Sequence, residues 1–125
     1  MVIAGAFTRA SGYEMTQKIL TLSPRPTALF AANNFIALGA LRALEEAHVR
    51  VPIDMAVVTF DDLPESLVIS PFLTVAAQPV YKMATRATEI LINRLTGASA
   101  GEGFEEVIFP TQLIVRQSSG NKLNT

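Results

Sequence analysis

The chain has 125 residues, of which 50% are hydrophobic and 17% charged, and its formal net charge is −1 at pH 7. This length is enough for one globular domain with its own core. Ten basic residues against eleven acidic ones, with no basic cluster, argue against direct nucleic-acid binding. The absence of cysteine excludes disulfides and thiolate metal sites. Since neither a signal peptide nor an apolar run of the ~18 residues that span a bilayer is found, we expect a cytoplasmic protein without membrane contact.

The beginning of the chain predicts a strand end, a helix and a strand. Residues 2–4 form an apolar run that is typical of the tail of a strand. Ser11 and Glu14 match a capping box, so a helix is expected to begin after Ser11 and to end before Pro24. A strand is predicted at about residues 28–32.

A second helix is predicted after Asn33 and Asn34, whose side chains suit a helix N-terminus, and it extends to about His48. Its inward stripe is expected to consist of large apolar residues, namely Phe35, Leu38, Leu41 and Leu44. Another face carries the small residues Gly39, Ala40 and Ala43. Small side chains there permit close approach of the sheet or of a second subunit.

The stretch from Val51 to Asp62, VPIDMAVVTFDD, predicts a buried strand that ends on two carboxylates. Residues 55–60 show no polar alternation, which is typical of a strand covered on both faces in a parallel sheet. Ligands collect at the carboxyl ends of such strands. We therefore expect Asp61 and Asp62 at a ligand site.

The second half of the chain completes an α/β pattern. A helical turn is predicted at residues 63–66, and a long helix from Pro79 to Leu95 that Gly97 ends. Further strands are expected at residues 72–77, 104–109 and 112–115. This order predicts an α/β fold with a largely parallel sheet flanked by helices.

Polar or aromatic residues follow three successive predicted strands: Phe7 with Arg9, Asn33 with Asn34, and Asp61 with Asp62. The carboxyl ends of parallel strands converge, and an aromatic ring, an amide and a carboxylate together suit a sugar or a nucleobase. Alternatively, Asn33, Asn34 and Asp61 only cap helices and turns. Spacing alone leaves both interpretations open.

Catalytic motifs are missing from the sequence. It contains no glycine-rich phosphate loop, no nucleophile elbow and no histidine pair for a metal, so we predict neither enzymatic activity nor a cofactor. A magnesium-dependent receiver domain has a similar α/β plan. Its first strand must end on acidic residues, where this chain has Gly5, Ala6 and Phe7.

Three segments together resemble one bacterial family: PTALFAANNFIALGALRALEEAHVRVPIDMAVVTFDDLPES, SPFLTVAAQPVYKMATRATEILINRLTG and FPTQLIVRQSSG. They are similar to the C-terminal part of the effector-binding region in LacI/GalR-type transcription regulators, over residues from about Ser11 to Gly120. The resemblance implies a periplasmic-binding-protein-like type I fold. In that fold two α/β lobes surround a cleft for a small effector, and an N-terminal helix-turn-helix domain binds DNA.

The resemblance also implies roles for individual residues. Phe7 matches the aromatic residue that packs on the effector, Asn33 a polar contact, and Asp61 the carboxylate that binds effector hydroxyl or N–H groups. Gln78 matches a residue near the lobe crossover that can reach the ligand. Arg9, in a loop whose length and sequence vary in the family, is a further candidate, and Asp62 is left as a cap or turn residue.

Other positions concern assembly or depart from the family pattern. Leu38 and Ile69 fall on surfaces that pack across a two-fold dimer interface in the family; ordinary burial is the alternative. Asn34 stands where the family usually has aspartate, Thr59 where glycine is common and Val75 where threonine is usual.

By this resemblance, residues 1–78 and 104–118 form the C-terminal effector-binding lobe, and residues 119–125 a loose tail. The helix at 79–97 would pack on an N-terminal lobe whose strands, like the DNA-binding domain, are missing from this chain. Its apolar stripe is then expected to fold back on the sheet or to find another chain.

We therefore predict a fragment of a LacI-type regulator that senses a small molecule, most simply a sugar, and forms a homodimer. DNA is contacted only through the missing N-terminal domain. A sugar-binding protein of a transporter shares the fold and is the main alternative. The magnesium-dependent phospho-acceptor receiver domain is a further one.

Overall fold

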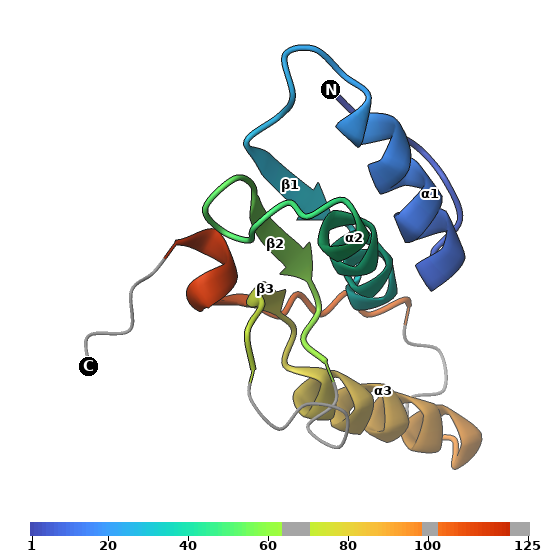
Figure 1. The fold of residues 1–125 in the computed structure, drawn as a ribbon. Coiled ribbons are helices and arrows are strands. Elements are labelled where there is room, and N and C mark those ends of the chain that lie inside the picture. Colours follow the sequence, from blue (N-terminus) through green and yellow to red (C-terminus); the bar gives the residue numbers. More distant parts are fainter. Residues whose placement is uncertain (64–70, 99–102, 121–125) are drawn as a thin grey trace. The chain divides into compact units, whose positions relative to one another are not determined.

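A computed structural model describes residues 1–63, 71–98 and 103–120 of the chain. These residues belong to two compact units, each considered by itself. The first unit comprises Met1–Ala77 and the stretch from Leu113 onward, and the second comprises Gln78–Gln112. Figure 1 shows the elements of both units along the chain.

A four-stranded sheet has the order β1-β2-β3-β4. Its strands are β1 (Ala28–Ala31), β2 (Ala56–Phe60), β3 (Thr74–Ala77) and the short β4 (Gln112–Ile114). Strand β2 pairs in parallel with both β1 and β3. The prediction of an α/β fold with a largely parallel sheet is thereby confirmed.

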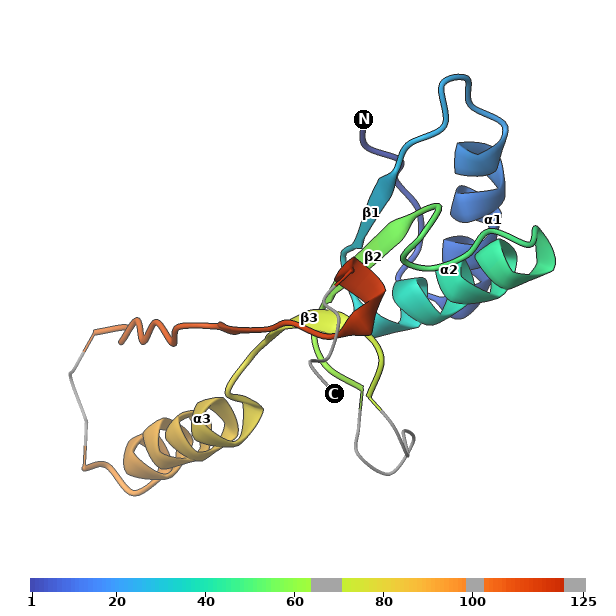
Figure 2. The same cartoon turned by 60° about the vertical axis from the view of Figure 1, so that its left-hand side comes forward.

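Strand β2 is buried on one face only, contrary to the prediction from its apolar sequence. Val57 and Thr59 are fully buried, whereas Ala56, Val58 and Phe60 remain partly exposed. On the neighbouring strand, Phe30 is 65% exposed. The reason is that helices α1 (Arg9–Leu20) and α2 (Asn34–Glu46) lie on the same side of the strands, as Figures 1 and 2 show.

Helix α1 begins earlier than predicted. Its N-cap is Thr8, whose side-chain oxygen accepts a hydrogen bond from the Ser11 N–H at 3.2 Å. The predicted cap, Ser11, therefore lies within the first turn of the helix. Both residues are hydroxyl-bearing and both suit the capping position, and the observed cap adds residues 9–11 to the helix.

Helix α2 begins as predicted, because the Asn33 side chain accepts a hydrogen bond from the Ile36 N–H at 2.8 Å. It ends at Glu46, slightly before the predicted end at His48. Its buried face was predicted correctly at Leu44 only, since Phe35 is 47% exposed and Leu38 and Leu41 are only partly buried. The fully buried residues are mainly small: Ala37, Gly39, Ala40, Ala43 and Leu44.

The small face of α2 lets α1 approach closely. A Cβ atom added to Gly39 would lie 2.0 Å from the Arg9 carbonyl oxygen, and one added to Gly12 would lie 2.3 Å from the Ile36 carbonyl oxygen. The element that packs closely on this small face is therefore helix α1, not the sheet or a second subunit as the sequence had suggested. The hydrophobic core of the first unit includes Leu44 from α2 together with Met55, Val57 and Val75.

Two predicted strands are not found among the described residues. Residues 2–4 and 104–109 have no strand assignment, although both runs are apolar. A segment forms a strand only where a neighbouring strand completes its backbone hydrogen bonds. Apolar side chains alone do not determine whether such a neighbour is present. Of the turn predicted at residues 63–66, only Leu63 lies within the described residues, and Ile69 lies outside them.

In the second unit, helix α3 (Val80–Leu95) ends as predicted, with Gly97 in the left-handed conformation at φ 77°. Arg86 pairs with Glu89 at 3.1 Å and also with Glu105. The Arg94 guanidinium lies 5.5 Å from the centre of the Phe104 ring. Helix α3 buries none of its residues, and Leu95 is 78% exposed.

Candidate functional site

Polar residues from two neighbouring strands meet at one edge of the sheet. Ala31 is in register with Thr59, so β1 and β2 reach this edge together. Asn33 and Asn34 follow β1, and Asp61 and Asp62 follow β2. The Asn34 side chain donates a hydrogen bond to the Asp62 carbonyl oxygen at 2.9 Å. The structure therefore brings these two predicted clusters together.

Asp61 forms a sharp corner after β2. Its φ of 67° lies in the left-handed region, which aspartate tolerates better than most non-glycine residues. Its N–H donates to the Ala76 carbonyl oxygen at 3.1 Å, which attaches the corner to β3. The role of the Asp61 side chain as a ligand contact stays a prediction.

Asp62 is held by an arginine from the end of the chain. Arg116 donates from Nη2 to Asp62 Oδ2 at 2.6 Å and from Nη1 to Asp62 Oδ1 at 2.9 Å. The Leu63 N–H also donates to Asp62 Oδ1, at 2.9 Å. The hydrogen bonds from Arg116 hold the pKa of Asp62 below its usual value, and the same contact raises the pKa of Arg116. The Asp62 carboxylate is thus engaged by an ion pair and by one backbone N–H.

Sequence reasoning missed Arg116, which lies 54 positions from Asp62. The local sequence does contain one signal, an arginine that directly follows the apolar run LIV at residues 113–115 and precedes polar residues. A cation in that place needs a partner when it is partly buried. Nothing in the local sequence indicates which carboxylate supplies it.

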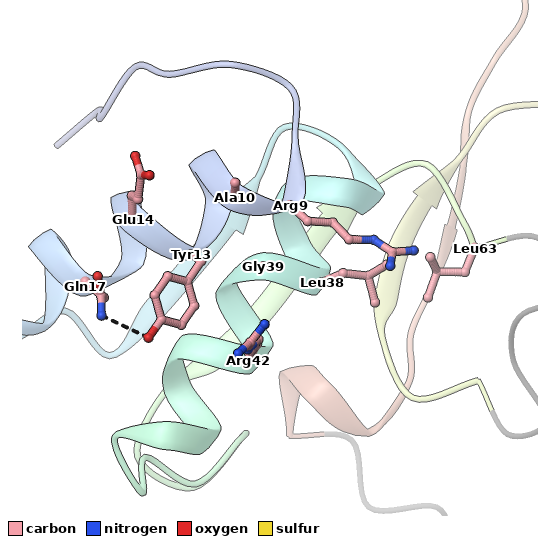
Figure 3. A pocket seen from close by; sticks show the side chains of 9 residues that line it. All are labelled: Arg9, Ala10, Tyr13, Glu14, Gln17, Leu38, Gly39, Arg42 and Leu63. Atoms are coloured by element: carbon pink, nitrogen blue, oxygen red, sulfur yellow. Dashed lines mark hydrogen bonds between the residues drawn. The ribbon is translucent and has the colours of Figure 1, made fainter.

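A separate groove of about 900 Å³ lies between α1 and α2. Arg9 and Leu38 line it and point toward Leu63, as Figure 3 shows. Tyr13 and Arg42 also line the groove, and the Arg42 guanidinium lies 5.6 Å from the centre of the Tyr13 ring. The structure thus places Arg9 in the same groove as the predicted interface residue Leu38.

The remaining predicted site residues are placed as follows. Phe7 is 66% exposed, just before the Thr8 cap of α1. Gln78 is the first residue of the second unit. The ligand roles of Phe7, Gln78, Asn33 and Arg9 stay predictions. The Asn33 side-chain oxygen caps helix α2.

The described part of the chain offers neither a metal-binding cluster nor a membrane-spanning helix. Residues 1–63, 71–98 and 103–120 contain no group of three or more His, Cys, Asp or Glu side chains placed to hold a metal ion. Among the same residues, no helix combines the length and the apolar character needed to cross a membrane.

Comparison with protein families decides the relationship. Residues 1–119 match the model of the periplasmic binding protein-like domain. The chain belongs to this family, within the LacI-type regulators. Its LacI-type relatives include the transcriptional repressor PurR of Haemophilus influenzae strain PittEE, which is 37% identical over 118 residues. That alignment covers 94% of the chain but 35% of PurR, so the chain spans about a third of the length of this relative.

Other LacI-type proteins are similar over most of the chain. The lactose operon repressor of Rhizobium radiobacter is 35% identical over 109 residues, covering 87% of this chain and 94% of that sequence. A LacI-family regulator of Enterococcus faecium, solved with bound ribose, has a TM-score of 0.78 at 29% identity and covers 90% of this chain and 40% of that one. One from Arthrobacter sp. FB24, in complex with lactose, has a TM-score of 0.79 at 29% identity, covering 94% and 43%.

Proposed function

We propose that this chain is the effector-sensing part of a LacI-type transcription regulator and that its effector is a small sugar. The observation that carries the proposal is the edge where Asn33 and Asn34 meet Asp61 and Asp62 at the carboxyl ends of parallel strands. Amide and carboxylate groups there suit the hydroxyl groups of a sugar. Solved LacI-family relatives that hold ribose and lactose support this ligand class.

The proposed mechanism is a shift between two arrangements of the full-length protein. An effector changes DNA affinity only by binding one arrangement better than the other. In this mechanism the chain binds and releases its effector without chemical change, in the cytoplasm, and DNA is bound by a domain outside this chain. The regulator names of the relatives favour this function over a transport protein.

The magnesium-dependent receiver gains no support from the site. The Asp62 carboxylate is engaged by both Nη atoms of Arg116, so a cation already occupies the position that a metal would need. Paired metal ligation by Asp61 and Asp62 is therefore disfavoured, and the proposed ligand contact is Asp61 alone.

The test uses the full-length parent protein and the variant Asp61→Ala. DNA binding is measured while ribose, glucose, lactose and sucrose are titrated in turn. We expect the wild-type protein to respond to at least one sugar. The variant should bind DNA normally but need about 10- to 100-fold more sugar, because a charged acceptor has been removed.

The matched control is Asp54→Ala, which removes a carboxylate that pairs with Arg50 before β2 begins. This variant should respond to sugar like the wild type. A parent protein that ignores every sugar would contradict the ligand class. A normal response by Asp61→Ala would contradict the site.

A further inference from the structure

Two arginine–aspartate pairs flank β2, one before it and one after it. Arg50 donates to Asp54 through Nε and Nη2, each at 2.8 Å, before the strand begins. Arg116 makes the corresponding two bonds to Asp62 after the strand ends. The first pair joins residues four positions apart, with an Arg50 side chain that is 67% exposed. The Arg116 side chain is only 18% exposed and comes from a distant part of the chain.

Arg116 is itself fixed in place. Its N–H donates to Thr74 Oγ1 at 2.8 Å, and the Thr74 hydroxyl donates to the Arg116 carbonyl oxygen at 3.0 Å. Its Nη1 also donates to the Leu73 carbonyl oxygen at 2.9 Å. Since backbone and guanidinium are both anchored beside β3, the two-pronged contact gives Asp62 a defined position.

The corner formed by Asp61 and Asp62 is thereby held from three directions. The Ala76 carbonyl oxygen of β3 accepts a hydrogen bond from the Asp61 N–H, and the Asn34 side chain of α2 donates one to the Asp62 carbonyl oxygen. Arg116 fixes the Asp62 side chain. Without Arg116 the Asp62 carboxylate, whose side chain is 34% exposed, would lose both charge-assisted hydrogen bonds and keep the one from the Leu63 N–H. The corner would then be held less firmly, because the contact that joins it to the anchored arginine is gone.

We propose that Arg116 is a positioning residue of the effector site: its contact with Asp62 holds the corner that presents Asp61 to the effector. The inference rests on the proposed function, in which Asp61 binds the effector. The chain re-enters the first unit at Leu113 and reaches Arg116 three residues later. The contact between Arg116 and Asp62 therefore also attaches the segment that begins at Leu113 to the corner formed by Asp61 and Asp62.

The first test needs no ligand. Hydrogen exchange of the Asp61 N–H is measured by NMR in the 125-residue chain and in Arg116→Gln. We expect exchange at Asp61 to be at least about tenfold faster in the variant, while the Val57 N–H within β2 is unchanged. Arg116→Lys keeps the charge but loses the two-pronged geometry, so its rate should be intermediate.

The matched control is Arg50→Gln, which breaks the pair before β2 and should leave Asp61 exchange at the wild-type rate. Unchanged exchange at Asp61 in Arg116→Gln would overturn the inference. Equal acceleration in both variants would also overturn it, because the effect would then be general loosening of the fold.

The second test separates positioning from stability in the full-length parent. Arg116→Gln should raise the half-effective sugar concentration about tenfold, whereas Arg50→Gln should leave it unchanged even if both lower the unfolding midpoint. An unchanged sugar concentration in Arg116→Gln would overturn the positioning role. If the wild-type parent responds to no sugar, the proposed function fails, and the exchange rate at Asp61 still decides whether Arg116 holds the corner.

Discussion

Arg50 and Asp54 form an exposed pair whose strength depends on pH. Hydrogen bonds from the Arg50 side chain and backbone hold the pKa of Asp54 at about 2, below its ordinary value of 3.8. The folded chain therefore binds protons less readily than the unfolded chain at this position. The stabilisation from Asp54 is present above about pH 4 and is lost as the pH falls toward 2.

In Arg50→Gln the stability of the chain should consequently fall less steeply as the pH is lowered. The measurement is the urea midpoint between pH 5 and pH 2.5. We expect the midpoint of the wild-type chain to fall more steeply than that of the variant over this range. Lys82→Gln on α3 removes the same charge from an exposed position and should keep the wild-type slope. Identical slopes for Arg50→Gln and wild type would show that the pair contributes nothing in solution.

Among the elements, the crossing of α1 and α2 is the most sensitive to an added methyl group. Gly39→Ala would bring Cβ to 2.0 Å from the Arg9 carbonyl oxygen and 2.7 Å from the Tyr13 nitrogen, both backbone atoms that cannot rotate away. Overpacking of this kind costs about 1–3 kcal/mol. Alanine regains at most about 1 kcal/mol through its better helix propensity.

We therefore expect Gly39→Ala to lower the free energy of unfolding measured in urea. The control is Gly103→Ala, where an added Cβ meets nothing within 4 Å. If Gly39→Ala proved as stable as Gly103→Ala, the close crossing of the two helices would not exist in solution.

Local chemistry predicted the elements better than it predicted their faces. The Asn33 cap, the strand before Asp61 and the end of α3 at Gly97 are set by residues within a few positions, and all three are confirmed. The buried face of α2 depends on where α1 packs, which no local pattern shows. The pairing of Arg116 with Asp62 likewise requires the assembled sheet.

At the scale of the whole molecule, the groove between α1 and α2 is the surface that we propose for the homodimer. Leu38 and Leu63 give it apolar contacts, and Arg9 and Arg42 give it charge. Such a mixture is typical of interfaces that exclude water at the centre and stay polar at the rim. The resemblance to LacI-type regulators had already suggested Leu38 as an interface residue.

Leu38→Glu should weaken dimerisation of the 125-residue chain. We expect sedimentation equilibrium to show a dimer for the wild type and a dissociation constant at least about tenfold higher for the variant, because a buried interface position would then carry a charge. Leu95→Glu on α3 makes the same change at a position that is 78% exposed and tests for a contribution from that helix. A monomeric wild type, or equal dissociation constants for Leu38→Glu and wild type, would contradict the proposed surface.

The contact between Arg116 and Asp62 has a consequence for the alignment of β2 along its own axis. Hydrophobic alternation normally prevents a strand from slipping, since a shift by one residue exchanges its two faces. Residues 55–60 lack polar alternation, so their pattern opposes slippage only weakly. A shift of β2 by one residue would carry Asp62 about 3.3 Å away from an arginine that is anchored on Thr74 of β3. The ion pair therefore selects one pairing of β2 with β3 where the apolar residues alone would permit several.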